Sequence, residues 1–213
     1  MKPIIGIVGK YYINKDNNRI IQSNLEIIES IIKHGGNPII ISPNKNKLDL
    51  KKIIDICDGI ILQGGYNFYK TEEIVYKYAL IKDKSILGIC AGMQLMCNID
   101  LTNSIKDKTI KNNTFINHNN NTKYAHNIKI IENTKLYEIF KNNKIKVNSR
   151  HNYHIKKVKN LHVCAISNDN IIEAVEYSNK NFVIGVEWHP ESMIKYDKYS
   201  NKLFKEFIKS CKK

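Results

Sequence analysis

The sequence predicts an α/β fold with an open, mostly parallel central sheet that is flanked by helices. Up to residue 98, short apolar runs that end at glycine or turn residues alternate with segments of helical periodicity. Strands that alternate with helices favour a parallel sheet, because each helix carries the chain back to the same end of the sheet. After residue 98, strand-like pieces follow one another directly, which predicts an additional antiparallel strand region in the C-terminal half.

The N-terminal half is expected to alternate strands with helices. Residues 4–8 are a continuous apolar run that ends at Gly9, as in a strand buried on both faces. A helix is expected over 19–34, where isoleucines and a leucine recur at helical spacing before Gly35. The remaining strands are expected at 38–42, 59–62 and 85–89, and the remaining helices at 48–57, 71–82 and 91–98.

The C-terminal half is expected to contain strands in series and one last helix. The asparagine run at 117–121 predicts a solvated loop, and residues 199–210 predict an amphipathic helix. No internal repeat or Pro/Ser-rich linker divides the chain, so residues 1–213 are expected to form a single domain. The strands are expected at 127–131, 145–148, 162–166, 171–177 and 182–186.

The composition argues against several function classes. The 213 residues include 34 lysines and arginines against 20 acidic residues, which gives a net charge of +14. Lysine is spread along the chain without a basic patch that interleaves aromatic residues, so no nucleic-acid partner is expected. The apolar runs are far shorter than the ~18 residues of a membrane span, and the N-terminus lacks a signal-peptide pattern. We therefore expect no membrane partner and a cytoplasmic location.

Cys90 stands where a strand meets a helix. The strand at 85–89 runs into Gly88-Ile89-Cys90-Ala91-Gly92, and the flanking glycines allow a sharp turn that would present the thiol at the edge of the sheet. A helix N-terminus favours the thiolate, which is the nucleophilic form. The alternative is a buried cysteine that merely ends a strand. The five cysteines form no Cys-x-x-Cys pair, so neither a disulfide framework nor a zinc knuckle is expected.

Two further segments hold partners for such a nucleophile. The strand at 182–186 leads into Glu187-Trp188-His189-Pro190-Glu191, where His189 is a candidate general base and Glu191 a candidate group that orients it. After the strand at 59–62, the backbone N–H groups of Gly64 and Gly65 are candidates, with that of Ala91, for holding an oxyanion.

Together these segments resemble the class I glutamine amidotransferase superfamily, and within it the γ-glutamyl hydrolase-like branch, peptidase family C26. Residues 88–94 match the family motif G-[IV]-C-x-G-x-Q, and residues 185–191 match G-V-[QE]-W-H-P-E. Val147-Asn148-Ser149-Arg150-His151 matches V-N-S-x-H, which marks this branch. The resemblance implies a flavodoxin-like fold and a catalytic triad of Cys90, His189 and Glu191 that forms a γ-glutamyl thioester.

The resemblance also implies a set of substrate-binding residues. Gln94 corresponds to a position that contacts the amino-acid end of the glutamyl group, and backbone near Arg150 would line the same pocket. The Arg150 side chain either grips an anionic group of the substrate or points to solvent. The full expected set is Gln94, Ser149, Arg150, His151 and Tyr153.

No metal site and no other cofactor are expected. His151 and His154 have i, i+3 spacing, but no third ligand follows at a matching distance along the chain. His118 and His126 flank the asparagine run and receive no role.

The sequence departs from the family at the leaving-group side. Ala91 stands where many members have arginine, and the segment after Gly65 is short and lacks the usual Asp and Pro. The first hypothesis is therefore a hydrolase of γ-glutamyl amides, such as γ-glutamyl-γ-aminobutyrate or a related metabolite, acting alone or as a homodimer. The second is a glutaminase subunit that supplies ammonia to a separate synthetase. A third, weaker hypothesis is a non-catalytic binding relative.

Overall fold

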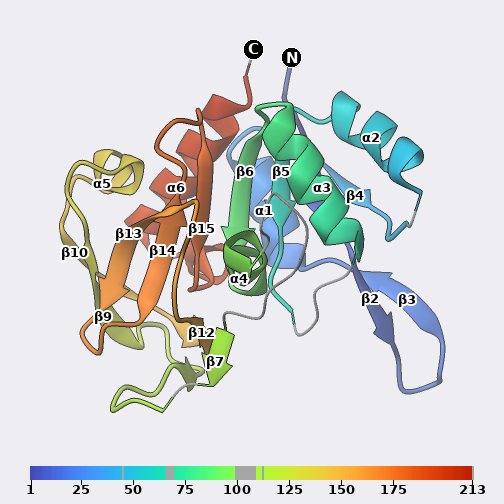
Figure 1. The fold of residues 1–213 in the computed structure, drawn as a ribbon. Coiled ribbons are helices and arrows are strands. Elements are labelled where there is room, and N and C mark those ends of the chain that lie inside the picture. The colour runs from blue at the N-terminus through green and yellow to red at the C-terminus, as the bar shows by residue number, and fades with distance from the viewer. Residues whose placement is uncertain (45, 66–69, 99–108, 112, 213) are drawn as a thin grey trace.

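The protein is built on a nine-stranded central sheet with helices on both faces (Figure 1). The computed structural model describes residues 1–44, 46–65, 70–98, 109–111 and 113–212. The order of the strands in the sheet is β10-β9-β13-β14-β15-β6-β5-β1-β4. The parallel strands are β1 (Ile4–Val8), β4 (Asn37–Ile41), β5 (Gly59–Leu62), β6 (Ser85–Ile89) and β15 (Val183–Val186).

The sheet changes character at β15. On one side β15 pairs with β6 in parallel, in the register Val186 to Ile89. On the other side it pairs antiparallel with β14, and the strands beyond β14 are antiparallel as well. These outer strands are β14 (Ile172–Glu176), β13 (His162–Ser167), β9 (His126–Ile130) and β10 (Lys144–Val147). The expected antiparallel region in the C-terminal half is therefore confirmed.

Two hydrophobic cores cover the two faces of the sheet (Figure 1). Because strand side chains alternate between faces, Ile61 of β5 joins one core while its neighbours Ile60 and Leu62 join the other. The first core includes α1 (Leu25–Lys33), α5 (Lys135–Phe140) and α6 (Lys198–Ser210). The second includes α2 (Lys47–Ile56), α3 (Lys70–Ile81) and α4 (Ala91–Asn98).

Short strand pairs and one 3-10 helix lie outside the central sheet. Among the described residues, no helix is long and apolar enough to cross a membrane. The pairs are β2 (Lys10–Ile13) with β3 (Arg19–Gln22), β7 (Thr109–Lys111) with β12 (Tyr153–Ile155), and β8 (Asn119–Asn120) with β11 (Ser149–Arg150), and the 3-10 helix is η1 (Pro190–Met193).

The prediction of one helix over 19–34 was wrong at its start. Residues 19–22 form β3 of a hairpin, because the Asn14 side chain accepts the N–H groups of Asp16 and Asn18 and turns the chain back. The helix begins only at Leu25, after Asn24 has capped it by accepting the Glu26 N–H. Isoleucines at helical spacing thus continued across the boundary of two elements.

Several further elements differ from the expectation. The short strands β2, β7, β11 and β12 and the 3-10 helix η1 were not predicted. Helix α5 was not predicted; it begins where Thr134 caps the Tyr137 N–H and the Glu176 carboxylate accepts the first N–H groups of the helix. Within the asparagine run, residues 119–120 form β8 rather than a free loop. The other predicted strands and helices are present with small shifts at their ends.

Candidate active site

Cys90 lies at the sharp turn between the end of β6 and the start of α4. Its φ is +50°, a left-handed conformation that is rare for residues with a side chain. A Cβ on Gly92 would lie 2.0 Å from the Leu62 carbonyl oxygen, and one on Gly88 would lie 2.4 Å from Met96 Sδ. The turn therefore requires both glycines, and the sharp turn expected from the sequence is present.

His189 reaches the same edge from the neighbouring strand β15. Its Nδ1 lies 2.8 Å from Glu191 Oε1, and the Glu191 side chain is almost completely buried. Burial alone would lower the pKa of His189. The negative charge of Glu191 and the hydrogen bonding to Cys90 outweigh that effect and raise the pKa of His189 to about 10. The imidazole is therefore held in its protonated form beside the sulfur.

Two asparagines hold this pair in place. Asn148 Nδ2 donates to the His189 carbonyl at 2.9 Å, and its Oδ1 accepts the His189 N–H at 2.8 Å. Asn24 Nδ2 donates to Glu191 Oε1 at 3.3 Å while Asn24 Oδ1 caps α1. Sequence reasoning named neither as a site residue. Asn148 stands in the V-N-S-x-H motif and could have been found there, whereas no local signal marks Asn24.

The expected oxyanion residues lie at the ends of β5 and β6. A Cβ on Gly64 would lie 3.0 Å from His189 Cε1 and 3.5 Å from Cys90 Cβ, so this backbone packs against both groups. Gly65 has a φ of +149° and faces the aliphatic part of Lys10. Ala91 is the first residue of α4, where backbone N–H groups have no partner within the helix. Gly64 and Ala91 thus flank Cys90 from two elements.

Gln94 lies one helical turn after Cys90 and is buried. Its Nε2 donates to the Tyr153 carbonyl at 3.1 Å and to the Glu187 carboxylate. Burial raises the pKa of Glu187 well above its ordinary value, and electrostatic interaction with Cys90 adds to the effect. Gln94 is therefore fixed between β12 and the segment that precedes His189.

The V-N-S-x-H segment sends its side chains in different directions. Ser149 is fully buried and its Oγ donates to the His118 carbonyl at 2.7 Å. Arg150 is exposed, and its guanidinium donates to Ser192 Oγ, beside Glu191. His151 is buried, whereas the Tyr153 side chain is half exposed and contributes its carbonyl oxygen to Gln94.

Three buried histidines lie together in the antiparallel half of the molecule, and the sequence analysis assigned them no common role. The His118 ring contacts those of His126 and His151, around the carboxylate of Glu173. Spacing along the chain does not reveal this group, because its members come from separate segments of the antiparallel half. His154, which the sequence offered as the partner of His151, is not part of it.

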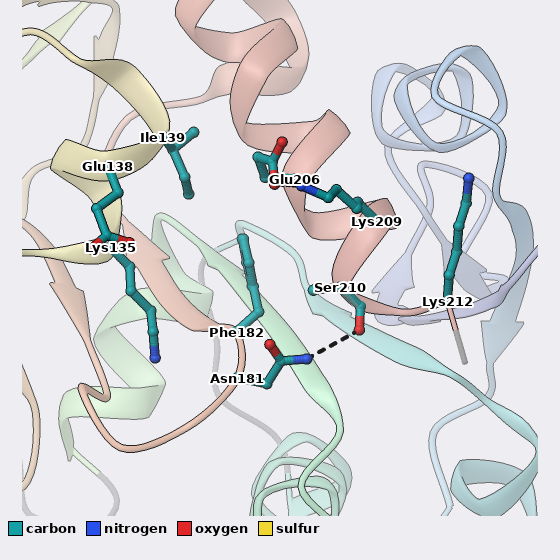
Figure 2. A pocket seen from close by; sticks show the side chains of 9 residues that line it. All are labelled: Lys135, Glu138, Ile139, Asn181, Phe182, Glu206, Lys209, Ser210 and Lys212. Atoms are coloured by element: carbon teal, nitrogen blue, oxygen red, sulfur yellow. Dashed lines mark hydrogen bonds and ion pairs between the residues drawn. The ribbon is translucent and has the colours of Figure 1, made fainter.

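The leaving-group side of the site is only partly described. Residues 66–69, where the sequence departs from the family pattern, lie outside the described residues. A hollow of about 470 Å³ between α5 and α6 has Phe182 and Ser210 in its wall (Figure 2). It lies at the end of β15 opposite to His189 and is therefore separate from Cys90.

Comparisons with known proteins agree with these motifs. The family model described as Peptidase C26 matches residues 3–74 and 69–191. A protein of Schizosaccharomyces pombe named as a putative glutamine amidotransferase is 33% identical over 87% of this chain and 81% of its own length. CTP synthase of Hydrogenobaculum sp. is 30% identical over 97% of this chain, which spans only 43% of that enzyme.

A solved structure agrees with the fold. The glutaminase domain of Trypanosoma brucei CTPS with bound acivicin superposes with a TM-score of 0.68 at 17% identity, over 98% of this chain and 93% of that chain. At this identity the likeness concerns the fold, and the expected mostly parallel α/β architecture with flanking helices is confirmed.

Proposed function

The chain belongs to the Peptidase C26 family and is a glutamine amidotransferase-type hydrolase of amide bonds, and from this premise we propose that it cleaves γ-glutamyl amides through Cys90. One observation carries the proposal: Cys90 sits at a strained turn within hydrogen-bonding reach of a His189 that Glu191 keeps protonated. A thiolate beside an imidazolium is the form that attacks a carbonyl carbon.

In the first half of the reaction, the Cys90 sulfur attacks the γ-amide carbon and forms a C–S bond. The N–H group of Ala91, together with an N–H of the Gly64–Gly65 turn, stabilises the oxyanion of the tetrahedral intermediate. When the C–N bond breaks, His189 gives its proton to the leaving amine, and a γ-glutamyl thioester remains. Glu191 keeps the ring oriented and stabilises its charge.

In the second half, water attacks the thioester. His189 takes a proton from this water, the C–S bond breaks, and glutamate leaves as the thiolate and imidazolium re-form. Gln94 is proposed to contact the amino-acid end of the glutamyl group, because it lies one turn from Cys90 and its amide is fixed by two acceptors.

A second candidate is a glutaminase that passes ammonia to a separate synthetase. The observation that favours it is the match to CTP synthase, in which this chain corresponds to 43% of a longer enzyme. Under this reading the acyl chemistry at Cys90 is the same, the leaving group is ammonia, and a synthetase is the partner.

A substrate panel separates the two candidates. The isolated protein is assayed for glutamate release from glutamine and from γ-glutamyl amides of neutral and anionic amines. Faster turnover of γ-glutamyl amines supports the hydrolase, whereas activity restricted to glutamine supports the glutaminase.

The role of Cys90 is tested separately with acivicin, the compound bound to the related glutaminase domain. Intact-mass measurement should show one adduct on the wild type and on Cys97→Ala, and none on Cys90→Ala. Glutamate release by Cys90→Ala at the wild-type rate would refute the mechanism.

A further inference from the structure

A buried group of three imidazoles and one carboxylate lies in the antiparallel half of the molecule. His118, His126, His151 and Glu173 are all buried, and one donor atom from each lies within 4.8 Å of the others. We call these four residues the histidine cluster. His126 begins β9 and Glu173 lies in β14, while the other two members come from segments next to β8 and β11.

The spacing of the donor atoms is that of metal ligands. Zn–N bonds of about 2.0–2.1 Å in a tetrahedron place neighbouring ligand atoms roughly 3.3 Å apart. His118 Nδ1 lies 3.2 Å from His151 Nε2 and 3.3 Å from Glu173 Oε1. Glu173 Oε1 also lies 3.3 Å from His126 Nε2 and 3.9 Å from His151 Nε2.

Hydrogen bonds within the described residues leave three inward-facing atoms of this cluster unsatisfied, namely His126 Nε2 and both carboxylate oxygens of Glu173. Glu173 has no exposed surface, and among the described residues no donor forms a hydrogen bond of normal geometry with either of its carboxylate oxygens. The same holds for His126 Nε2. A proton shared between His118 and His151 would satisfy only those two nitrogens. A buried carboxylate without hydrogen bonds is costly unless its charge is compensated. A cation at the centre would compensate the charge of Glu173, which otherwise faces only the neighbouring imidazoles.

The outer nitrogen of each ring faces an oxygen. His118 Nε2 lies 3.0 Å from Asp169 Oδ2, His151 Nδ1 lies 2.9 Å from the Tyr153 carbonyl, and His126 Nδ1 lies 3.3 Å from the Asn127 carbonyl. A ring that donates its N–H outward turns its lone pair inward. This arrangement is typical of histidines that bind metals, whose second nitrogen donates to a carboxylate or a carbonyl.

We propose that His118, His126, His151 and Glu173 bind one divalent transition-metal ion, and that zinc is the best match. Three imidazoles and a carboxylate suit zinc, and three of their donor pairs already lie at 3.2–3.3 Å, close to tetrahedral ligand spacing. Mg²⁺ and Ca²⁺ prefer sets of oxygen ligands. Four protein ligands fill the coordination sphere, so the ion is structural. A hollow of about 360 Å³ that His118 and His151 help to line gives the ion a path to the cluster.

The ion would connect the antiparallel strands to the wall of the active site. His151 and Gln94 share the Tyr153 carbonyl, so fixing His151 also fixes the group that holds Gln94. The metal site stands on the cluster itself and does not depend on the identity of the substrate.

The first test is metal content. The protein is produced without a polyhistidine tag in zinc-supplemented medium and measured by elemental analysis. We expect about one zinc ion per chain after exhaustive dialysis. Metal-free protein should melt at a lower temperature and recover with Zn²⁺ but not with Mg²⁺, and Co²⁺ should give the visible absorption of a tetrahedral complex.

Variants then locate the ion. His126→Gln and Glu173→Gln, which preserve the approximate size of the side chains, should lose zinc, whereas Asp169→Asn should weaken binding by roughly 10–100-fold, as expected for an outer partner. His162→Gln, which removes an exposed histidine outside the cluster, should bind zinc like the wild type. If the cluster variants do not fold, the melting shift and Co²⁺ spectrum of the wild type decide the question. A wild type without bound zinc and without a melting shift, or cluster variants that bind zinc normally, would overturn the proposal.

Discussion

At the scale of single residues, the structure constrains the backbone of Cys90 and of His189 as well as their side chains. Cys90 is held at positive φ by the glycines around it. The peptide groups on both sides of the His189 side chain are held by one buried asparagine, Asn148. Since a small displacement of a reacting group lowers catalysis strongly, residues that never touch the substrate are expected to affect turnover.

Asn148 offers a test of this view. Asn148→Ala leaves the His189 N–H without its partner and leaves the His189 carbonyl with only the Ser192 N–H at 3.3 Å. We expect this to cost about 1–3 kcal/mol of folding stability and to free the ring. We expect kcat to fall while KM changes little. Asn148→Asp keeps the acceptor for the His189 N–H and should retain more of the stability. Steady-state kinetics and urea unfolding measure both effects, and an unchanged kcat in Asn148→Ala would contradict the positioning role.

A second prediction for a single residue concerns the side chain of Arg150. Its side chain is exposed, and its guanidinium hydrogen-bonds to Ser192 Oγ. Exposed substitutions usually change stability by less than about 0.5 kcal/mol, and we expect Arg150→Ala to alter kcat/KM equally little for anionic and neutral γ-glutamyl amides. A selective loss of about 1.5–3 kcal/mol for the anionic amide would instead assign this side chain to substrate binding.

At the scale of elements, the site forms where the carboxyl ends of parallel strands meet. β5 brings Gly64, β6 brings Cys90 and β15 brings His189 to one edge of the sheet. Ligand sites of open α/β sheets lie at this edge, because the strands end there and helices begin. The start of α1 adds Asn24, which links this helix to Glu191.

Asn24 has two functions that substitutions can separate. Asn24→Ala removes the helix cap, which costs about 1 kcal/mol of stability, and also removes the contact to Glu191. Asn24→Ser retains a capping oxygen but is too short for that contact. We therefore expect both variants to lose turnover, whereas only Asn24→Ala loses stability. Equal turnover of Asn24→Ser and wild type would rule out a role in orienting Glu191.

The close approach of α4 to β5 gives another prediction. A Cβ on Gly92 would meet the backbone oxygen of Leu62 at 2.0 Å, so Gly92→Ala must push α4 and Cys90 away from the sheet. Overpacking of this kind costs about 1–3 kcal/mol, and we expect most of the turnover to be lost. Gly35→Ala is the control, because its Cβ would meet nothing within 4 Å and would add only backbone strain. Wild-type kinetics in Gly92→Ala would contradict the requirement.

At the scale of the molecule, the active site joins the two halves of the sheet. The parallel half supplies Cys90 and His189. The antiparallel half supplies Asn148, which holds His189, and Tyr153, whose carbonyl holds Gln94. Glu191 lies only two residues from His189, but Cys90, which also raises the pKa of His189, comes from a distant segment and meets it only in the folded sheet. The protonation of His189 is therefore linked to folding.

This linkage predicts a pH dependence of stability. The pKa of His189 is about 10 in the folded protein and about 6.5 in an unfolded chain. Its proton therefore stabilises the fold fully below about pH 6.5, and the contribution is lost as the pH rises through about 10. The difference in unfolding free energy between wild type and His189→Gln should shrink over this range. A constant difference for His189→Gln would contradict the raised pKa.

The sequence by itself determined most of the elements and the order of the three motifs. Apolar runs, glycine stops and helical spacing are local signals, so β1, β5, β6 and α4 have the predicted bounds. Prediction from local spacing was wrong where the spacing of apolar residues continued across a turn, as between β3 and α1. It missed α5, whose start is stabilised by the carboxylate of Glu176 from a distant strand.

Only the tertiary structure decided what surrounds the motifs. Asn24 reaches Glu191 across 167 positions of the chain, and His118, His126, His151 and Glu173 meet only because antiparallel pairing stacks their strands. Contacts of this kind leave no period in the sequence, since the residues between them are free to vary in number and type. The physical reason is that a polar group buried by the fold must be hydrogen-bonded or paired with another group, wherever that partner lies in the sequence.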